Sequence, residues 1–342
     1  MNSQKKPKRK PRATIKDVAR LAGVSIASVS RVINHTADVS PETEARVKRA
    51  ISALDYRPHL AARSLVRRRT NTIGLILPEF GDEYVSLLLR GIELEARKND
   101  MGLLVFATQY PKTMENPKPL GDENTDGVVV FVDSLPLADL ARFEQIGFPV
   151  VLIHRTAAYG LDIPCVTIEN RDSARRAVDH LIDVHGYRRI AFLSGMAGHE
   201  DSSLREVGYR ESLAAHGIAY DPALIAEGGF NREQAQRAVA KWLRTQTEID
   251  AIFCGDDEMA MGALSAINRA GKRVPQDIAL VGFDDIAPAR YLSPPLTTVR
   301  APIEQVGALA VLQLMKIIRG EAVEPLVLLP TELIIRQSCG CA

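Results

Sequence analysis

Aromatic rings, carboxylates and cationic groups recur at the ends of the apolar runs in this sequence. The candidate ligand-binding residues at these positions are Phe80, Tyr84, His154, Arg155, Arg205, Phe230, Asp256 and Asp284. Aromatic rings stack on the apolar face of a pyranose, and Asp and Arg form paired hydrogen bonds with hydroxyl groups. If the apolar runs are parallel strands, their carboxyl ends share the edge at which such sheets bind ligands. The pattern therefore indicates a sugar-binding pocket.

Each of these side chains also has an ordinary structural interpretation. An Asp after a strand is more often the cap of the next helix than a ligand contact, and Asp256 or Asp257 can cap the helix that is expected to begin there. Arg155 can belong to a structural ion pair. The sugar hypothesis therefore depends on the whole set and not on any one member.

The stretch from Thr14 to Asn34 predicts a different chemistry, because it is typical of two short helices joined by a turn. Thr14 and Ser25 stand where helix caps are expected, and Gly23 suits the turn between the helices. The apolar faces that should meet are Val18, Ala19 and Leu21 of the first helix, and Val29, Val32 and Ile33 of the second. The residues left for DNA contacts are Thr14, Ser25, Ile26, Ala27, Ser28, Ser30, Arg31 and Asn34.

A short helix with small, apolar and Arg or Asn side chains on its outer face suits the major groove of DNA. The alternative is an ordinary helical hairpin that only packs. Charge favours DNA: residues 1–70 hold 17 Lys and Arg against 5 Asp and Glu, whereas residues 71–342 hold 26 against 37. This basic head on an acidic body suggests phosphate binding by the head alone.

The N-terminal region divides into three expected segments. Residues 1–12 are a disordered basic arm, and residues 13–58 are a helix–turn–helix domain that a third helix from about Pro41 to Leu54 completes. Residues 59–70 are a hinge helix and linker, too short to be stable alone and expected to fold on docking to DNA and a partner copy. In this segment Ala62 and Leu65 are candidate DNA contacts, with Leu65 as a minor-groove wedge. A plain interdomain connector is the alternative.

From residue 71 onward, apolar runs alternate with amphipathic helical segments. The expected strands are 73–77, 103–106, 127–132, 149–153, 165–168, 189–194, 250–254 and 278–282. The expected helices lie near 84–99, 136–146, 171–185, 204–216, 231–245, 256–270 and 303–319. This alternation predicts parallel sheets covered on both faces, arranged as two similar α/β lobes with a division near 153–165 and a cleft between them.

Several classes of protein are disfavoured. The sequence contains no GxxxxGK[ST], GxSxG or HExxH motif, so we expect no enzyme and no cofactor. No run of 18 apolar residues predicts a membrane span, and the basic N-terminus lacks the apolar segment of a secretory signal. The four cysteines form no disulfide framework, which favours a reducing cytoplasm. Cys339 and Cys341 are a weak metal signal, since no His lies near them in the sequence.

Ordered motifs run from residue 13 to residue 340. They include TIKDVA (14–19), GVS (23–25), VSRVIN (29–34), LDYRP (54–58), AARSL (61–65), IGL (73–75), SLREVGY (203–209), DDEMAMG (256–262), VGFDD (281–285) and SPPLTTV (293–299). With these motifs the chain resembles the lac-repressor/galactose-repressor (LacI/GalR) family of bacterial transcription regulators. The resemblance implies a helix–turn–helix head, a hinge helix and a two-lobed body like that of periplasmic binding proteins.

The resemblance also assigns expected roles to particular residues. A homodimer would bind a near-palindromic operator, with Ile26, Ala27 and Arg31 at the specificity positions and Arg31 reading a guanine. In the body, Asp284 matches the family's Asp that binds effector hydroxyls, and Arg205 matches its effector-binding Arg. Phe230 and Tyr84 match aromatic residues that form the walls of the family's effector pocket. Asp256 stands where the family often has Asn.

The expected function is therefore a repressor in the bacterial cytoplasm, on the nucleoid, whose small effector is most simply a sugar. Effector binding would favour one arrangement of the lobes and so order or melt the hinge helices. The alternative is a periplasmic-type sugar-binding protein, against which the basic head argues. Two departures stand out: DEYV at 82–85 adds acid to the pocket mouth, and the proline-rich segment 110–125 replaces a helix near the expected dimer interface. No heptad-bearing tail follows, so no tetramerisation helix is expected.

Overall fold

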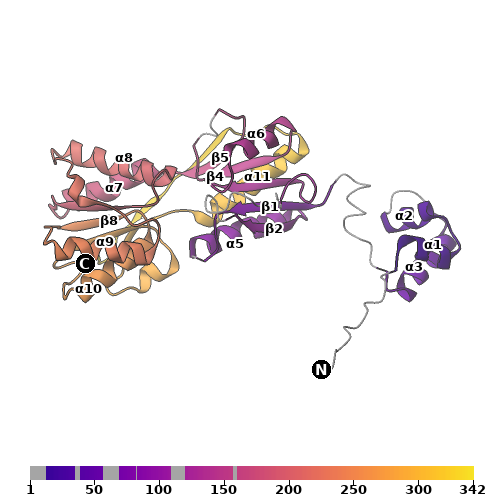
Figure 1. Cartoon of the computed structure of the whole chain (residues 1–342), viewed down its shortest axis with the longest axis horizontal. Helices are drawn as coiled ribbons and strands as arrows, with labels where there is room; N and C mark the ends of the chain where they lie inside the picture. Colours follow the sequence, from indigo (N-terminus) through magenta and orange to yellow (C-terminus); the bar gives the residue numbers. More distant parts are fainter. Residues whose placement is uncertain (1–12, 35–38, 57–68, 82, 109–119, 157–159) are drawn as a thin grey trace, which may run out of the picture. The chain divides into compact units, whose positions relative to one another are not determined.

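The computed structural model describes residues 13–34, 39–56, 69–81, 83–108, 120–156 and 160–342, except for the side chain of Asn34. The chain divides into two compact units, residues 1–70 and residues 71–342, here called the head and the body (Figure 1). No helix within the described ranges is long and apolar enough to cross a membrane.

The head consists of α1 (Ile15–Ala22), α2 (Ile26–Asn34) and α3 (Pro41–Ala53). Its core contains Val18, Val29 and Val47, each of them completely buried. One expectation is wrong, because the Leu21 side chain is 56% exposed and Ala22 lies in the core instead. Val18, Ala19 and Ala22 form the buried stripe of α1, and Leu21 lies one helical position, about 100°, away from Ala22.

The first lobe of the body is a parallel sheet in the order β11-β5-β4-β3-β1-β2. These strands are β1 (Thr72–Leu77), β2 (Gly102–Ala107), β3 (Gly127–Phe131), β4 (Val150–Ile153), β5 (Cys165–Ile168) and β11 (Leu326–Leu329). Helices α5 (Glu83–Lys98) and α11 (Ile303–Arg319) pack with the core on one face, and α6 (Leu137–Gln145) packs on the other.

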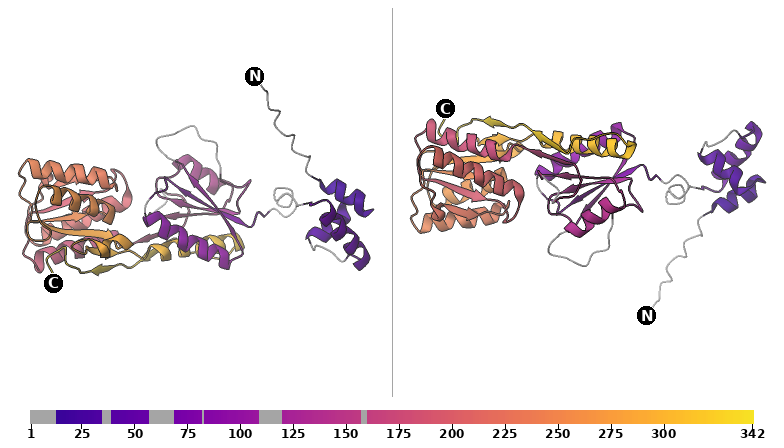
Figure 2. Two further views of the ribbon diagram at one scale, coloured as in Figure 1. Left: turned by 90° about the horizontal axis from the view of Figure 1, so that it is seen from below. Right: turned by 90° about the horizontal axis from the view of Figure 1, so that it is seen from above.

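The second lobe repeats this three-layer arrangement, which Figure 2 shows from two sides. Its strands, in the order β12-β10-β9-β8-β6-β7, are β6 (Ile190–Ser194), β7 (Ile225–Glu227), β8 (Ala251–Cys254), β9 (Ala279–Asp284), β10 (Thr297–Arg300) and β12 (Glu332–Ile334). All pairs are parallel except β10 with β12. Helices α7 (Asn170–Asp183) and α8 (Glu200–Ala215) cover one face, and α9 (Arg232–Arg244) and α10 (Asp257–Arg269) cover the other. Two short 3-10 helices, η1 (Pro222–Leu224) and η2 (Ala287–Tyr291), complete this lobe.

The chain passes between the lobes three times, after β5, after β10 and after β11. The expected division near 153–165 is therefore wrong. Strand β5 pairs with β4 and with β11 in the first sheet, so residues 154–164 connect two strands of the same lobe. The eight expected strands are confirmed within a few residues, but β7, β10, β11 and β12 were not expected. Each has only three or four residues, too few for periodicity to identify.

Glycines allow the helices that cover the sheets to approach one another closely. A Cβ atom on Gly91 of α5 would lie 1.9 Å from the carbonyl oxygen of Glu304 in α11. A Cβ on Gly208 would lie 2.1 Å from the Arg171 carbonyl oxygen, between α8 and α7, and one on Gly262 the same distance from that of Arg232, between α10 and α9. In each case the obstacle is backbone, which cannot turn aside as a side chain can, so a larger residue would force the helices apart.

Candidate functional site

Asp284 ends β9 with a carboxylate that is buried and incompletely paired. Its side chain is 8% exposed, and Oδ1 accepts no hydrogen bond from any residue that the structure describes. The nearest cationic atom with which it pairs is Nη2 of Arg205, at 3.9 Å. Burial raises the pKa of Asp284 well above its ordinary value, although the charge of Arg205 acts in the opposite direction. An incompletely paired buried carboxylate is a ready acceptor for a ligand hydroxyl.

Arg205, on α8, is held in one orientation by its other nitrogens. Its Nε donates to Oδ1 of Asn170 at 2.9 Å, its Nη1 donates to the Gly255 carbonyl, and its guanidinium stacks 3.7 Å from the centre of the Phe283 ring. The remaining nitrogen, Nη2, lies 3.9 Å from Asp284 and 4.0 Å from Asp201. Both separations are too long for a direct hydrogen bond, but a hydroxyl group can bridge such a gap.

A hydrogen-bonded series leads from this arginine to the first lobe. Asp201, on α8, accepts from Asn170 at 2.8 Å and pairs through Oδ2 with Nδ1 of His154 at 2.9 Å. The other ring nitrogen of His154 lies 2.5 Å from the Tyr84 hydroxyl. Burial opposes ionisation of Asp201, but His154 and Arg205 outweigh it and lower the pKa of this carboxyl. Polar contacts thus join the carboxyl end of β4 in one lobe to α8 in the other.

Aromatic rings lie on both sides of this series. In the first lobe the Tyr84 ring is perpendicular to that of Phe131 at 6.4 Å, and Phe131 lies 5.0 Å from His154. In the second lobe Phe230 contacts His199 edge-on at 5.0 Å. The Phe230 ring also occupies the space into which a Cβ on Gly195 would project, 2.1 Å from the nearest ring carbon.

His199 is a buried histidine at the start of α8. Its Nδ1 has no hydrogen-bond partner within the described part of the chain. Burial is the main cause that lowers the pKa of His199, so the ring is held neutral over more of the acidic range than an exposed histidine.

The remaining candidate ligand-binding residues form a helix cap, form ion pairs or are exposed to solvent. Asp256 caps α10, because its Oδ1 accepts from the Met259 amide at 2.6 Å. Arg155 forms ion pairs with Asp133 at 2.6 Å and with Glu200 of the second lobe at 3.4 Å. Both contacts fit the structural alternatives for these residues. Phe80, in the loop after β1, is 55% exposed.

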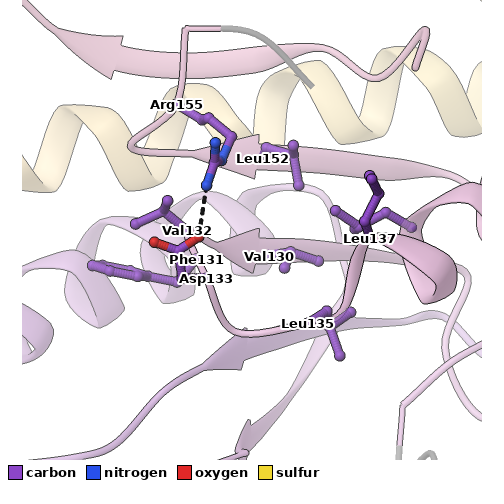
Figure 3. A pocket seen from close by; sticks show the side chains of 9 residues that line it. Val130, Phe131, Val132, Asp133, Leu135, Leu137, Leu152 and Arg155 are labelled. Carbon is purple, nitrogen blue, oxygen red and sulfur yellow. Dashed lines mark hydrogen bonds and ion pairs between the residues drawn. The ribbon is translucent and has the colours of Figure 1, made fainter. Parts of the chain in front are cut away.

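A pocket of about 230 Å³ opens beside the ion pair of Arg155 and Asp133 (Figure 3). Seven of its nine lining residues are apolar, and the lining comes from the ends of β3 and β4, from α6 and from the segment between β3 and α6. Phe131 belongs both to this pocket and to the ring cluster around His154. The pocket therefore adjoins the polar series without containing Arg205 or Asp284.

The residues expected at the carboxyl ends of the strands include some members of this polar series but not all of them. The structure brings Tyr84, His154, Arg205 and Asp284 into one connected series, whose linking residues, Asn170 and Asp201, were not expected. Two signals were available in the sequence. Asn170 begins the helix that follows β5, and Asp201 stands one helical turn before Arg205.

The outer face of α2 is the candidate DNA-reading surface of the head. Ile26 is 45% exposed, and Ala27 and Arg31 are exposed beside it, whereas Ser28 and Ser30 are half-buried. Ser25 caps the helix, since its Oγ accepts from the Ser28 amide at 3.1 Å. The side chain of Asn34, together with Ala62 and Leu65, lies outside the described residues.

The cap of α1 is also formed as the sequence indicates. The amide and hydroxyl of Thr14 donate to Oδ2 of Asp17 at 3.0 and 2.7 Å. These hydrogen bonds, the side-chain one first, lower the pKa of Asp17. The cap fixes the start of α1, on which the orientation of α2 depends.

Two parts of the chain match known protein families. Residues 14–59 match the bacterial regulatory proteins of the lacI family, and residues 178–339 match the periplasmic binding protein-like domain. Over 344 aligned residues the chain is 34% identical to the HTH-type transcriptional regulator CelR of Thermobifida fusca, covering 96% of this chain and 99% of that one.

Two solved structures are similar over nearly the full length. One is a complex of the transcriptional regulator CelR with cellobiose, with a TM-score of 0.70 and 31% identity, covering 96% of this chain and 100% of that chain. The other is the lac repressor dimer bound to operator and the anti-inducer ONPF, with a TM-score of 0.81 and 25% identity, covering 96% and 99%.

Proposed function

This chain belongs to the lacI family of bacterial transcriptional regulators, and on that premise we propose that it is a repressor controlled by a sugar. It binds a palindromic operator as a homodimer, and the effector binds between the two lobes of the body. A regulator of this kind acts on the chromosome, so we place it in the cytoplasm, in association with the nucleoid.

The observation that carries the sugar proposal is the gap between Arg205 and Asp284. One sugar hydroxyl can donate to Oδ1 of Asp284 and accept from Nη2 of Arg205, which lie 3.9 Å apart. The rings of Tyr84, Phe131 and Phe230 provide apolar surfaces of the kind that cover the faces of a pyranose. A phosphorylated effector is less well matched, since Asp201 and Asp284 already supply two carboxylates to one guanidinium.

Control of DNA binding follows from contacts that join the lobes. His154 and Arg155 of the first lobe pair with Asp201 and Glu200 of α8 in the second. A sugar that binds to Arg205 and Asp284 lies next to these pairs and favours whichever lobe arrangement completes its hydrogen bonds. The arrangement of the lobes then sets the spacing of the hinge segments 59–70, where Ala62 and Leu65 contact DNA.

DNA recognition is assigned to the outer face of α2. Arg31 is exposed and can form two hydrogen bonds with a guanine, whereas Ile26 and Ala27 suit thymine methyl groups. Thr14, Ser25, Ser28, Ser30 and Asn34 are assigned to the surrounding contacts with the DNA backbone and base edges.

The test combines a DNA-binding and a sugar-binding measurement on the full chain. Fluorescence anisotropy with a palindromic site from upstream of its own gene is compared with the same site scrambled, at moderate salt. Cellobiose, ribose and galactose are then added separately, and their direct binding is measured by calorimetry. Equal affinity for the two DNA fragments would contradict operator binding, whereas operator binding with no response to any sugar would contradict only the effector class.

A further inference from the structure

The C-terminal tail of the chain brings two cysteines against two histidines of the second lobe. The side chains of His180, His185, Cys339 and Cys341 each offer one ligand atom, and these four atoms all lie within 4.8 Å of one another. The Cys341 sulfur is 3.6 Å from Nε2 of His180 and 3.4 Å from Nε2 of His185. The expectation that no histidine neighbours these thiols holds only along the sequence and is wrong in space.

These distances suit a tetrahedral metal ion. With metal–sulfur bonds of about 2.3 Å and metal–nitrogen bonds of about 2.0 Å, the ligand atoms of a tetrahedral site are about 3.3 to 3.8 Å apart. Both measured sulfur–nitrogen distances fall in this range. The remaining ligand atoms are within 4.8 Å, so small side-chain rotations bring them to the same spacing.

The tail is fixed in this position by the β-sheet of the second lobe. The Ser338 carbonyl accepts from the Leu280 amide at 2.8 Å, and its hydroxyl donates to the Leu280 carbonyl at 2.6 Å. Cys339, the next residue, is completely buried, and its sulfur accepts from the Thr297 hydroxyl at 3.2 Å. The first thiol therefore does not depend on a metal for its position.

The turn at Gly340 places the second thiol. Gly340 has a φ of 111°, and a Cβ atom there would lie 3.1 Å from Nδ1 of His185 and 3.2 Å from the hydroxyl oxygen of Tyr187. Tyr187 stacks on His185 and donates to the Cys339 carbonyl at 3.4 Å. A glycine at this position lets the tail turn closely over His185 and carry Cys341 to the imidazoles.

We propose that His180, His185, Cys339 and Cys341 form a Cys2His2 site for a zinc ion, which ties the C-terminal tail to α7. Two thiolates and two neutral imidazoles neutralise a divalent cation, and zinc is the metal whose structural sites most often have this ligand set and geometry. When the ion binds, each cysteine thiol loses its proton to solvent and forms a metal–sulfur bond, while both histidines bind through a ring nitrogen.

The site has a mechanical consequence for the body. Helix α7 follows the first crossing between the lobes, and the tail follows the third, through β12. A metal ion bound to α7 and to the C-terminal tail joins these two segments within the second lobe. Metal binding should therefore stabilise this lobe, independently of sugar and DNA.

The experiment uses the full chain after reduction with a phosphine and removal of metal with a chelator. Zinc is added, excess is removed, and the bound metal is measured by mass spectrometry, with one ion per chain expected. Cobalt(II) is then substituted for zinc. A tetrahedral thiolate site gives intense visible d–d bands and a near-ultraviolet sulfur-to-cobalt charge-transfer band.

Two variants and one control make the result specific. Cys341→Ser and His185→Gln are expected to lose stoichiometric binding and the tetrahedral cobalt spectrum, with circular dichroism unchanged. Cys165→Ala, the control, removes a buried thiol of the first lobe. It should keep both the stoichiometric zinc binding and the tetrahedral cobalt spectrum. Thermal unfolding should occur several degrees higher with zinc than without it in the parent chain and in Cys165→Ala, but not in Cys341→Ser.

Three results would overturn the proposal. These are less than half an equivalent of zinc in the reduced chain, a pale octahedral cobalt spectrum without charge transfer, and equal metal content in Cys341→Ser and the parent. Formation of a Cys339–Cys341 disulfide in air, with no zinc binding after reduction, would identify the pair as a redox couple instead. None of these results depends on operator or sugar binding, so failure here leaves the proposed function untouched.

Discussion

The Nη2 atom of Arg205 and the Oδ1 atom of Asp284 lie 3.9 Å apart in the second lobe, with the other two nitrogens of the guanidinium already engaged. The separation leaves one donor and one acceptor facing each other at about the span of a bridging hydroxyl. An ion pair built for stability alone would close this gap. The incomplete pair therefore indicates where a sugar hydroxyl binds.

At about pH 8, the end of the tested range at which Asp284 is more ionised, Asp284→Asn is expected to weaken binding of the effector sugar about 10- to 150-fold, because a hydrogen bond to a charged group contributes about 1.5–3 kcal/mol. Calorimetric titration with whichever sugar of the panel binds measures the change. Asp277→Asn is the matched control, since Asp277 is exposed and accepts from its neighbour Arg273. Unchanged affinity in Asp284→Asn would remove Asp284 from the binding site.

Asp284→Asn should also become more stable relative to the unsubstituted parent chain as the pH rises. Burial raises the folded-state pKa of Asp284 well above the ordinary value of 3.8, so the folded chain holds this proton more tightly than the unfolded chain. The contribution of Asp284 to the stability of the parent chain is therefore greatest below pH 3.8. This contribution is lost as the pH rises through the folded-state pKa.

Asn cannot ionise, so the stability of Asp284→Asn relative to the parent should rise by about 1.4 kcal/mol per pH unit within that window. Urea unfolding at about pH 4 and about pH 8 checks this prediction. Asp257, whose pKa is also raised by burial, is present in both proteins, and its charge acts with burial to raise the pKa of Asp284. A stability difference that does not change with pH would show that Asp284 is ionised in the folded chain throughout.

In the head, Arg31→Ala should lower affinity for the operator about 5- to 150-fold and relax the preference at one base pair, because a paired contact to guanine contributes about 1–3 kcal/mol. Affinity for scrambled DNA should change only a few-fold. Anisotropy titrations on both DNA fragments give the ratio, and Arg237→Ala, which removes an exposed charge from the body, controls for charge alone. Equal losses on both fragments would assign Arg31 to the phosphate backbone.

For the body, Gly91→Ala is expected to cost about 3 kcal/mol or more in free energy of unfolding, because the added methyl group would lie 1.9 Å from the Glu304 carbonyl oxygen. Denaturant unfolding of both proteins measures the loss. Gly121→Ala is the matched control, since its Cβ would meet nothing closer than 3.5 Å. A stable Gly91→Ala protein would show that α5 and α11 can separate without loss of packing.

Local signals were enough to predict much of the fold. The cap at Ser25 and the turn at Gly23, with a φ of 65°, depend on residues within one helical turn, and both are formed as expected. The central strands are continuous apolar runs buried between two helix layers, which makes them recognisable without knowledge of their partners.

Long-range pairings could not be predicted in the same way. Strand β11 joins the first sheet beside β5, and no pattern around residue 326 indicates which lobe it enters. The roles of Asp201 and Asn170 could not be predicted either. They arise only because α7 and α8 pack together, which brings these residues to His154 and Arg205. The histidines beside the C-terminal cysteines were hidden by the same separation in sequence.

The three crossings between the lobes also constrain the order in which the protein can be made. Strand β5 is complete when residue 168 has left the ribosome, but its edge partner β11 does not exist until residue 329 has followed. A nascent chain that ends before residue 326 therefore presents β5 as an uncovered sheet edge, which is a template for aggregation. Neither lobe can be expressed as one uninterrupted piece of the sequence, so a premature stop anywhere before β11 leaves both incomplete.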